Sequence, residues 1–193
     1  YMHAKKETTS RRGILEISRA VSTTPWLGTL SYNFASPGSN PIGNQHPIPY
    51  QAEVHDTRYQ YGFAMTPASL LRDHVIRTEK TLRAIQNLRR VAGNHARYLY
   101  DFAPEAIVLR WTADPAPRLL YCFEEGERGQ ITIERLLSRI RGSEPDIDPS
   151  ELIVGSAIAI PGLDQFPKET QIFDGVKAAV TAVLRRVREH LEH

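Results

Sequence analysis

The hydrophobic period of this 193-residue chain changes from two to about 3.6 residues near Thr66, and this change sets its fold class. Over 55–64, aromatic and β-branched side chains alternate with polar or small ones, which is typical of a strand. From Pro67 to about Ala92, apolar residues recur at helical spacing and predict an amphipathic helix. Thr66 is the expected N-cap of this helix, because its hydroxyl can accept a free backbone N–H.

The order of the predicted elements points to a known architecture. Strands are predicted over 14–21, 27–34, 105–111, 118–123 and 152–160, and further helices over 131–140 and 174–190. From His55 the order is therefore β-α-β-β-α-β with an extra helix, which is the RRM-like or ferredoxin-like order. We expect an α+β fold: a modified RRM/ferredoxin-like palm, an antiparallel sheet with helices on one face, with inserted loops.

The chain is expected to form a single domain over residues 1–190. Residues 35–49 are rich in Ser, Pro, Gly and Asn, so an inserted exposed loop is predicted at about 35–50. Residues 191–193 look like the start of an expression tag. The single cysteine, Cys122, can form no disulfide within the chain, and no secretory signal opens the sequence. These features predict a reducing, cytoplasmic compartment.

Charge is distributed unevenly along the chain. Residues 1–141 carry nineteen Lys and Arg against thirteen Asp and Glu, whereas residues 142–193 carry five against nine. A basic body with an acidic end suits a polyanion-binding protein that packs head-to-tail against copies of itself. Ordinary scatter of surface charge explains the same totals equally well.

Basic and polar side chains gather where the predicted long helix ends. At roughly 100° per residue, Arg83 and Arg90 lie within about 20° of Arg72, and such a stripe can follow a phosphate backbone. A solvated helix face is the alternative. After the helix, Asn and His side chains can contact bases or sugars and Arg can hold a phosphate. The full set of predicted RNA contacts is Lys5, Lys6, Arg11, Arg12, His46, Arg58, Arg72, Arg83, Arg90, Asn94, His95 and Arg97.

Three stretches of the sequence resemble the DevR-type backbone subunits of type I CRISPR-Cas Cascade complexes, which coat crRNA. They are 1–5 with 12–22, 40–50 with 59–65, and, most specific, Arg89–Pro104. The resemblance implies a palm with inserted finger and thumb elements that binds guide RNA. It also implies four partners: crRNA, copies of the chain, other Cascade subunits, and target DNA reached through the guide. Family members usually open with an additional strand and an asparagine-rich stretch, which we expect this chain to lack.

No motif in the sequence predicts catalysis, a metal or a cofactor. No His pair has HxxxH or HExxH spacing, and neither a Gly-x-Ser-x-Gly motif nor a Gly-rich phosphate loop occurs. Two alternatives stay open. A metal-dependent ribonuclease of the type III backbone kind would depend on Asp56 or Asp101, neither of which lies in a Gly-rich loop. A DNA-binding regulator of its own operon, as the family resemblance allows, would need a helix-turn-helix that the sequence does not show.

Overall fold

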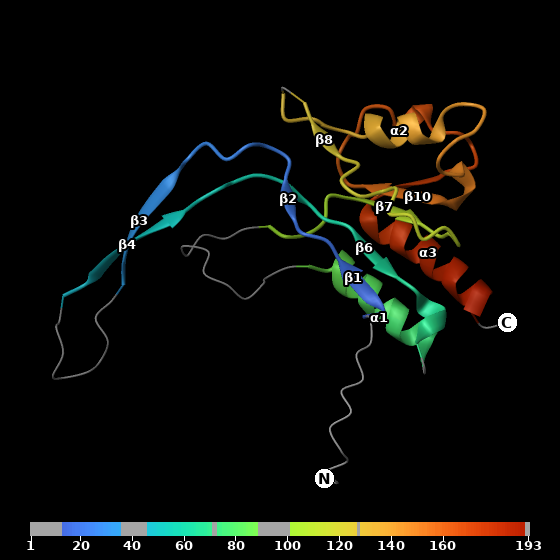
Figure 1. Ribbon diagram of the computed structural model, residues 1–193, viewed down its shortest axis with the longest axis horizontal. Helices are drawn as coiled ribbons and strands as arrows, with labels where there is room; N and C mark the ends of the chain where they lie inside the picture. Colours follow the sequence, from blue (N-terminus) through green and yellow to red (C-terminus); the bar gives the residue numbers. More distant parts are fainter. Residues whose placement is uncertain (1–12, 36–45, 71–72, 89–100, 127, 192–193) are drawn as a thin grey trace, which may run out of the picture.

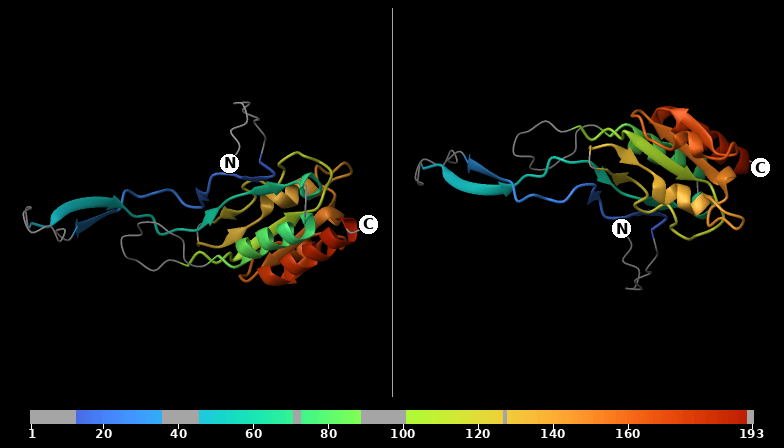
Figure 2. Two further views of the ribbon diagram at one scale, coloured as in Figure 1. Left: turned by 90° about the horizontal axis from the view of Figure 1, so that it is seen from below. Right: turned by 90° about the horizontal axis from the view of Figure 1, so that it is seen from above.

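The computed structural model describes residues 13–35, 46–70, 73–88, 101–126 and 128–191. These residues form a packed α+β body from which a two-stranded arm projects (Figure 1). The arm and the C-terminus lie at opposite ends of the molecule (Figure 2). The predicted α+β class is confirmed. None of the described helices combines the length and the apolar character needed to cross a bilayer.

A three-stranded sheet in the order β11-β10-β7 forms the centre of the body. Strand β7 (Ala106–Arg110) is antiparallel to β10 (Leu152–Ser156), and β11 (Gln171–Asp174) is parallel to β10. Helices α1 (His74–Gln86) and α3 (Val176–Leu191) pack on one face, and α2 (Glu134–Ile140) packs on the other. The sheet is therefore the middle of three layers.

This arrangement corrects the prediction of an antiparallel sheet with helices on one face. The reason lies in β10, where apolar residues occupy successive positions. Leu152 and Val154 pack in the α2 cluster, whereas Ile153 packs in the α3 cluster, and all three are buried. A strand that is apolar on both sides needs cover on both faces.

The apolar core consists of two clusters, one on each side of the sheet. The α2 cluster contains Cys122, Ile131, Ile133, Leu136, Leu137, Ile140, Ile147, Leu152, Val154, Ile160 and Phe166. The α3 cluster contains Leu82, Ile107, Leu109, Ile153, Val176, Ala179, Val180, Val183 and Leu184. Helix α3 approaches β10 so closely that a Cβ added at Gly155 would lie 2.5 Å from Cβ of Ala179. A side chain at position 155 would therefore push α3 away from the sheet.

Several predicted elements are shorter than expected or absent. Strand β11 was not predicted, and residues 118–123 form a turn in place of the predicted strand. Short strands β8 (Glu124–Glu125) and β9 (Ile131–Thr132) pair beside that turn. The helix expected from Pro67 divides into a 3-10 turn, η1 (Pro67–Ser69), and α1, which ends at Gln86 and not near Ala92. The Thr66 side chain makes no cap hydrogen bond.

The strand predicted over 55–64 is interrupted and pairs with the N-terminal strands. Strand β1 (Leu15–Ile17) pairs with β6 (Phe63–Met65), and β2 (Val21–Ser22) pairs with β5 (Tyr59–Gln60), all antiparallel. Between these pairs, Ser18 N–H donates to Gly62 O at 2.8 Å and Gly62 N–H donates to the Ser18 hydroxyl at 2.8 Å. The two pairs therefore form a continuous ribbon beside the body.

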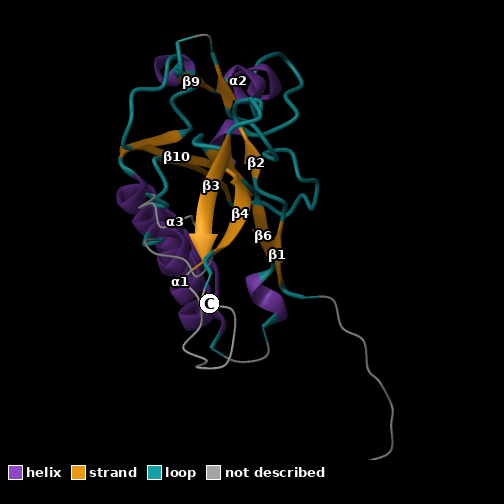
Figure 3. Cartoon of the chain, turned by 90° about the vertical axis from the view of Figure 1, so that its left-hand side faces the viewer, coloured by secondary structure: helices purple, strands orange, loops and turns teal. Residues whose placement is uncertain are grey.

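The arm consists of β3 (Leu30–Ala35) and β4 (Ile48–Glu53), which pair antiparallel from Leu30 opposite Glu53 to Ala35 opposite Ile48. Figure 3 views it end-on. The exposed loop predicted at about 35–50 thus overlaps the start of β4, and residues 36–45 lie outside the described residues. Strand β4 was not predicted, because Pro49 interrupts the alternation of apolar and polar residues and because proline has no backbone N–H to donate to a neighbouring strand.

Candidate nucleic-acid interface

The arm is exposed and aromatic, and it carries no formal charge before Glu53, the last residue of β4. No Lys, Arg, Asp or Glu occurs between Arg19 and Glu53. The pairing register puts Leu30, Tyr32 and Phe34 on one face, because paired residues alternate between the two sides of a ribbon. Tyr32 and Phe34 are 71% and 66% exposed. Exposed rings of this kind can stack on nucleobases, but the arm brings no cation for the phosphates.

A cleft of about 460 Å³ lies at the base of the arm. Its walls include Trp26 and Leu27, which follow β2, and Val54 and His55, which follow β4. Trp26 Nε1 donates to Val54 O at 3.2 Å and thereby holds the indole across the two chain segments. The His55 ring lies edge-on to Tyr59, with centroids 6.1 Å apart. The cleft therefore extends the aromatic surface of the arm toward the body.

Arg58, a predicted RNA contact, already has carboxylate partners. Its Nε donates to Glu105 at 2.6 Å and its Nη1 donates to Gly129 O at 3.3 Å, while Glu125 lies 3.7 Å from Nη1. The hydrogen bond with Glu105 is the largest reason that the pKa of Arg58 is raised. Arg58 thus ties the base of the arm to the body, and a phosphate would have to compete with two carboxylates.

Arg83 is also paired. Its guanidinium lies 2.8 Å from Glu79 on the same helix, and Glu79 also accepts a hydrogen bond of 2.7 Å from Arg188 on α3. These bonds, that of Arg188 first, lower the pKa of Glu79. Arg72 and Arg90, the other members of the predicted stripe, lie outside the described residues. Glu79 therefore joins α1 to α3 and is also the carboxylate partner of Arg83, the placed member of the stripe.

The remaining predicted contacts are placed only in part. His46 is exposed just before β4, on the arm. Lys5, Lys6, Arg11, Arg12, Asn94, His95 and Arg97 lie outside the described residues. Of the predicted set, the structure thus places His46, Arg58 and Arg83: His46 just before β4, Arg58 just before β5, and Arg83 on α1.

The sequence prediction missed the aromatic surface of the arm, namely Tyr32, Phe34 and Tyr50. A signal was present: a long stretch without charge in which Leu30, Tyr32 and Phe34 alternate with polar residues. The sequence predicts a strand over 27–34, but it assigns these rings no role. Only the pairing with β4 shows that no core covers these rings among the described residues.

The residues considered for catalysis have ordinary structural surroundings. The Asp101 carboxylate accepts the Ala103 N–H at 2.8 Å, which is a turn-forming bond. Asp56 is exposed beside the cleft at the base of the arm. Within the described ranges, no group of three or more His, Cys, Asp and Glu side chains is placed to hold a metal ion. Burial raises the pKa of Cys122 to about 12, so its thiol stays protonated near neutral pH.

Comparison with known proteins relates the chain to a curated protein. No family model matches the chain. A protein of Myxococcus xanthus (strain DK1622), named CRISPR-associated protein Cas7/Cst2/DevR, is 40% identical over 185 residues. The match covers 92% of this chain and 60% of that protein, so the chain spans about three fifths of the relative's length. The resemblance to DevR-type proteins is confirmed: the chain is a homologue of this protein, which is named Cas7/Cst2/DevR.

Proposed function

We propose that this chain is part of a guide-RNA-binding backbone subunit of a CRISPR surveillance complex, with no catalysis of its own. The observation that carries the proposal is the 40% identity to a protein named Cas7/Cst2/DevR. In this proposal the body is the RRM-like palm of the family, and the β3–β4 arm is one of the elements inserted into it.

The described surface supports two separate kinds of RNA contact: base stacking on the arm and phosphate contacts elsewhere. The arm supplies exposed rings, such as Tyr32 and Phe34, and no formal charge before Glu53. Phosphate contacts would come from the basic segments 5–12 and 89–97, which carry seven of the chain's Lys and Arg residues. Stacking combined with phosphate attraction is the usual means of holding a single strand without reading its sequence.

The proposed partners follow from the same assignment. The arm exposes Tyr32 and Phe34 on one face and Ile48 on the other, and this apolar surface, uncovered among the described residues, supports contact with another molecule. We propose crRNA and neighbouring copies of the chain, arranged head-to-tail along the guide in the cytoplasm. Other Cascade subunits and the target DNA, paired with the guide, complete the set.

An RNA titration of the purified chain tests this function. Binding to single-stranded RNA should be steeply salt-dependent, because each phosphate contact releases counterions. Arg97→Ala should weaken binding about tenfold or more if its guanidinium holds a phosphate. Arg83→Ala is the matched control: Glu79 already pairs with Arg83, so its loss should change affinity by less than about threefold. Circular dichroism must show both variants folded.

The same titration separates the alternatives. Salt-insensitive affinity, or unchanged affinity in a folded Arg97→Ala variant, would contradict the assigned contact. Tighter binding to duplex DNA than to RNA would favour the operon regulator. RNA cleavage with Mg²⁺ or Mn²⁺ that disappears in Asp56→Ala or Asp101→Ala would favour the ribonuclease.

A further inference from the structure

Strand β11 has a free edge in the described part of the chain. It pairs with β10 on one side, and no described strand pairs with its other side. Natural sheets usually protect such an edge with proline, lysine, a bulge or a covering segment. The four residues of β11, Gln171–Asp174, contain neither proline nor lysine, and their register with β10 is regular. The edge is therefore able to accept another strand.

The backbone groups that point to this edge can be identified. Gly175 N–H donates to Ser156 O on β10 at 2.7 Å. Because successive residues of a strand direct their N–H groups to opposite sides, Phe173 also faces β10, and Ile172 and Asp174 face outward. The Ile172 side chain is itself exposed. An added strand would bond to Ile172 and Asp174.

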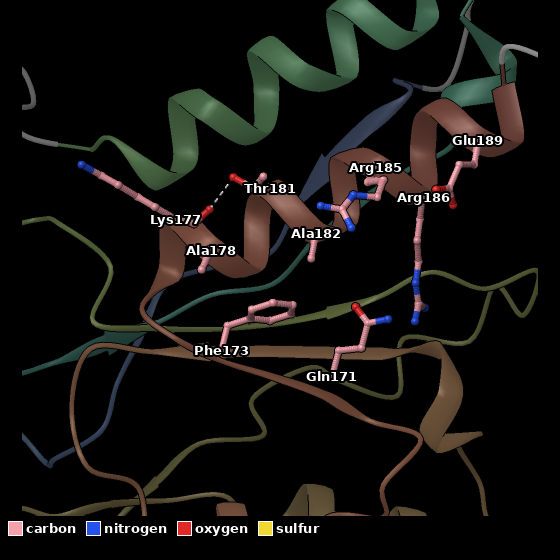
Figure 4. A pocket seen from close by; sticks show the side chains of 9 residues that line it. All are labelled: Gln171, Phe173, Lys177, Ala178, Thr181, Ala182, Arg185, Arg186 and Glu189. Atoms are coloured by element: carbon pink, nitrogen blue, oxygen red, sulfur yellow. Dashed lines mark hydrogen bonds between the residues drawn. The ribbon is translucent and has the colours of Figure 1, made fainter.

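A groove of about 620 Å³ runs between this edge and helix α3 (Figure 4). The α3 side is lined by the small residues Ala178, Thr181 and Ala182, and the β11 side by Phe173 and Gln171. The Thr181 hydroxyl donates to Lys177 O at 2.9 Å, within the helix. Small side chains on the helix leave room for the side chains of an incoming strand, and an apolar one can contact the Phe173 ring.

The charge on the groove indicates what kind of strand fits. Three α3 cations line it, Lys177, Arg185 and Arg186, against the single carboxylate of Glu189. Arg186 donates to Ser150 O at 2.9 Å, whereas the side chains of Lys177 and Arg185 have no hydrogen-bond or ion-pair partner within the described ranges. Pairing of β11 with β11 of a second copy would bring two such cationic helix faces together. The charge therefore favours an acidic partner over a second copy.

We propose that the β11–α3 groove binds an extended, acidic segment of a partner protein as an added strand. Main-chain hydrogen bonds to Ile172 and Asp174 hold the segment, and its carboxylates face Lys177 and Arg185. The proposal does not depend on RNA binding by the arm, because helix α3, which lines the groove, and the arm lie in different parts of the molecule (Figure 1).

Three probes of equal length test the proposal on the full chain by fluorescence anisotropy. One is an eight-residue peptide in which valine alternates with glutamate, the second has lysine in place of glutamate, and the third is an oligouridine. The glutamate peptide should bind, and the lysine peptide should bind at least about threefold more weakly, because it meets like charge. Equal binding of both peptides would overturn the proposal, and so would groove binding of the oligouridine alone.

Variants locate the binding. Lys177→Glu and Arg185→Glu should each weaken binding of the glutamate peptide about threefold or more, whereas Lys80→Glu, the same change on exposed α1 surface, should leave it unchanged. Ile172→Pro should abolish binding, because it removes an outward N–H at a position where an edge strand tolerates proline. If Ile172→Pro does not fold, the two charge-reversal variants test the proposal by themselves. Unchanged affinity for the glutamate peptide in both of them would refute binding in the groove.

Discussion

The body and the arm place similar side chains in opposite surroundings. Leu152, in the central strand, is 0% exposed and packs under α2, whereas Tyr32 and Phe34 on β3 are mostly exposed. Both strands carry apolar residues, yet β10 has a layer on each side and β3 has one neighbouring strand. Apolar content alone therefore does not define the core of this protein. The core is defined by how many layers cover a strand, and among the described residues no layer covers the arm.

This difference has a consequence for stability. A two-stranded hairpin is marginally stable by itself in water, so its apolar side chains contribute little to the folded body. A large exposed apolar surface instead marks a site of interaction. Substitutions in the body should therefore change stability, and substitutions in the arm should change binding.

The largest expected effect separates the two regions by matched truncations. Leu152→Ala should lower the free energy of unfolding by about 2–5 kcal/mol, because it leaves a cavity in the α2 cluster. Phe34→Ala removes a larger side chain from the arm but should change the free energy of unfolding by less than about 0.5 kcal/mol. Urea unfolding of both variants measures the difference. A large loss from Phe34→Ala would mean that the arm packs against the body.

A second pair of substitutions tests the close packing of α3 on the sheet. Gly155→Ala should cost about 1–3 kcal/mol, because its Cβ would lie 2.5 Å from Ala179 Cβ and 2.7 Å from Gly175 O. Gly126→Ala is the control: a Cβ there meets Gln130 atoms at 3.6 Å or more. Thermal melting should show a clear loss for the first variant only. Equal melting temperatures would disprove the tight contact.

A third prediction concerns RNA affinity. Replacing Tyr32 and Phe34 together by Ala should weaken binding of single-stranded RNA about tenfold, since stacking contributes about 1–3 kcal/mol per base. The melting temperature should stay the same. Ser138→Ala, at an exposed polar position on α2, serves as the control. If affinity is unchanged in the double variant, the arm's partner is a protein surface and not RNA.

The smallest expected effect depends on pH. Asp114 accepts hydrogen bonds from Arg118 at 2.8 Å, Ala116 N–H at 2.9 Å and Arg110 at 3.1 Å. The bond from Arg118, followed by that from Ala116, holds the pKa of Asp114 well below its usual range. A lowered carboxylate pKa stabilises the fold above the unfolded-state pKa, about 3.9, and this stabilisation is lost as pH falls.

Asp114→Asn should therefore lower the melting temperature at pH 7, and the gap from the wild type should narrow below about pH 4. Asp164→Asn, an exposed aspartate with no side-chain partner among the described residues, is the control and should behave like the wild type at both pH values. A gap that is constant with pH would show that Asp114 contributes through packing and not through its charge.

Local features of the fold could be predicted from the sequence to a large extent. The helix predicted over 174–190 matches α3, which runs to Leu191, and the helix predicted over 131–140 contains α2. Both have a strong 3.6-residue period. The helix after Thr66 was predicted too long at both ends, because η1 and Asp73, in the left-handed region with φ 51°, interrupt it.

The candidate site could be predicted only in part. Arg58 and Arg83 are both exposed, but the sequence indicates a carboxylate partner for only one of them. Glu79 lies four residues before Arg83, which is a readable helix spacing. Glu105 lies 47 residues after Arg58, and their contact exists only because the chain returns to the base of the arm. Long-range ion pairs of this kind leave no local pattern.

The sequence by itself determined the α+β class, the two C-terminal helices and the relation to DevR-type proteins, because these depend on local periodicity and on residue identity. The tertiary structure decided the mixed order of the sheet, the cover on both faces of β10 and the open edge of β11. It also decided that the apolar face of β3 lies in an exposed arm. These features depend on which distant segments meet, and alternation along one strand is the same whether a core or a partner covers it.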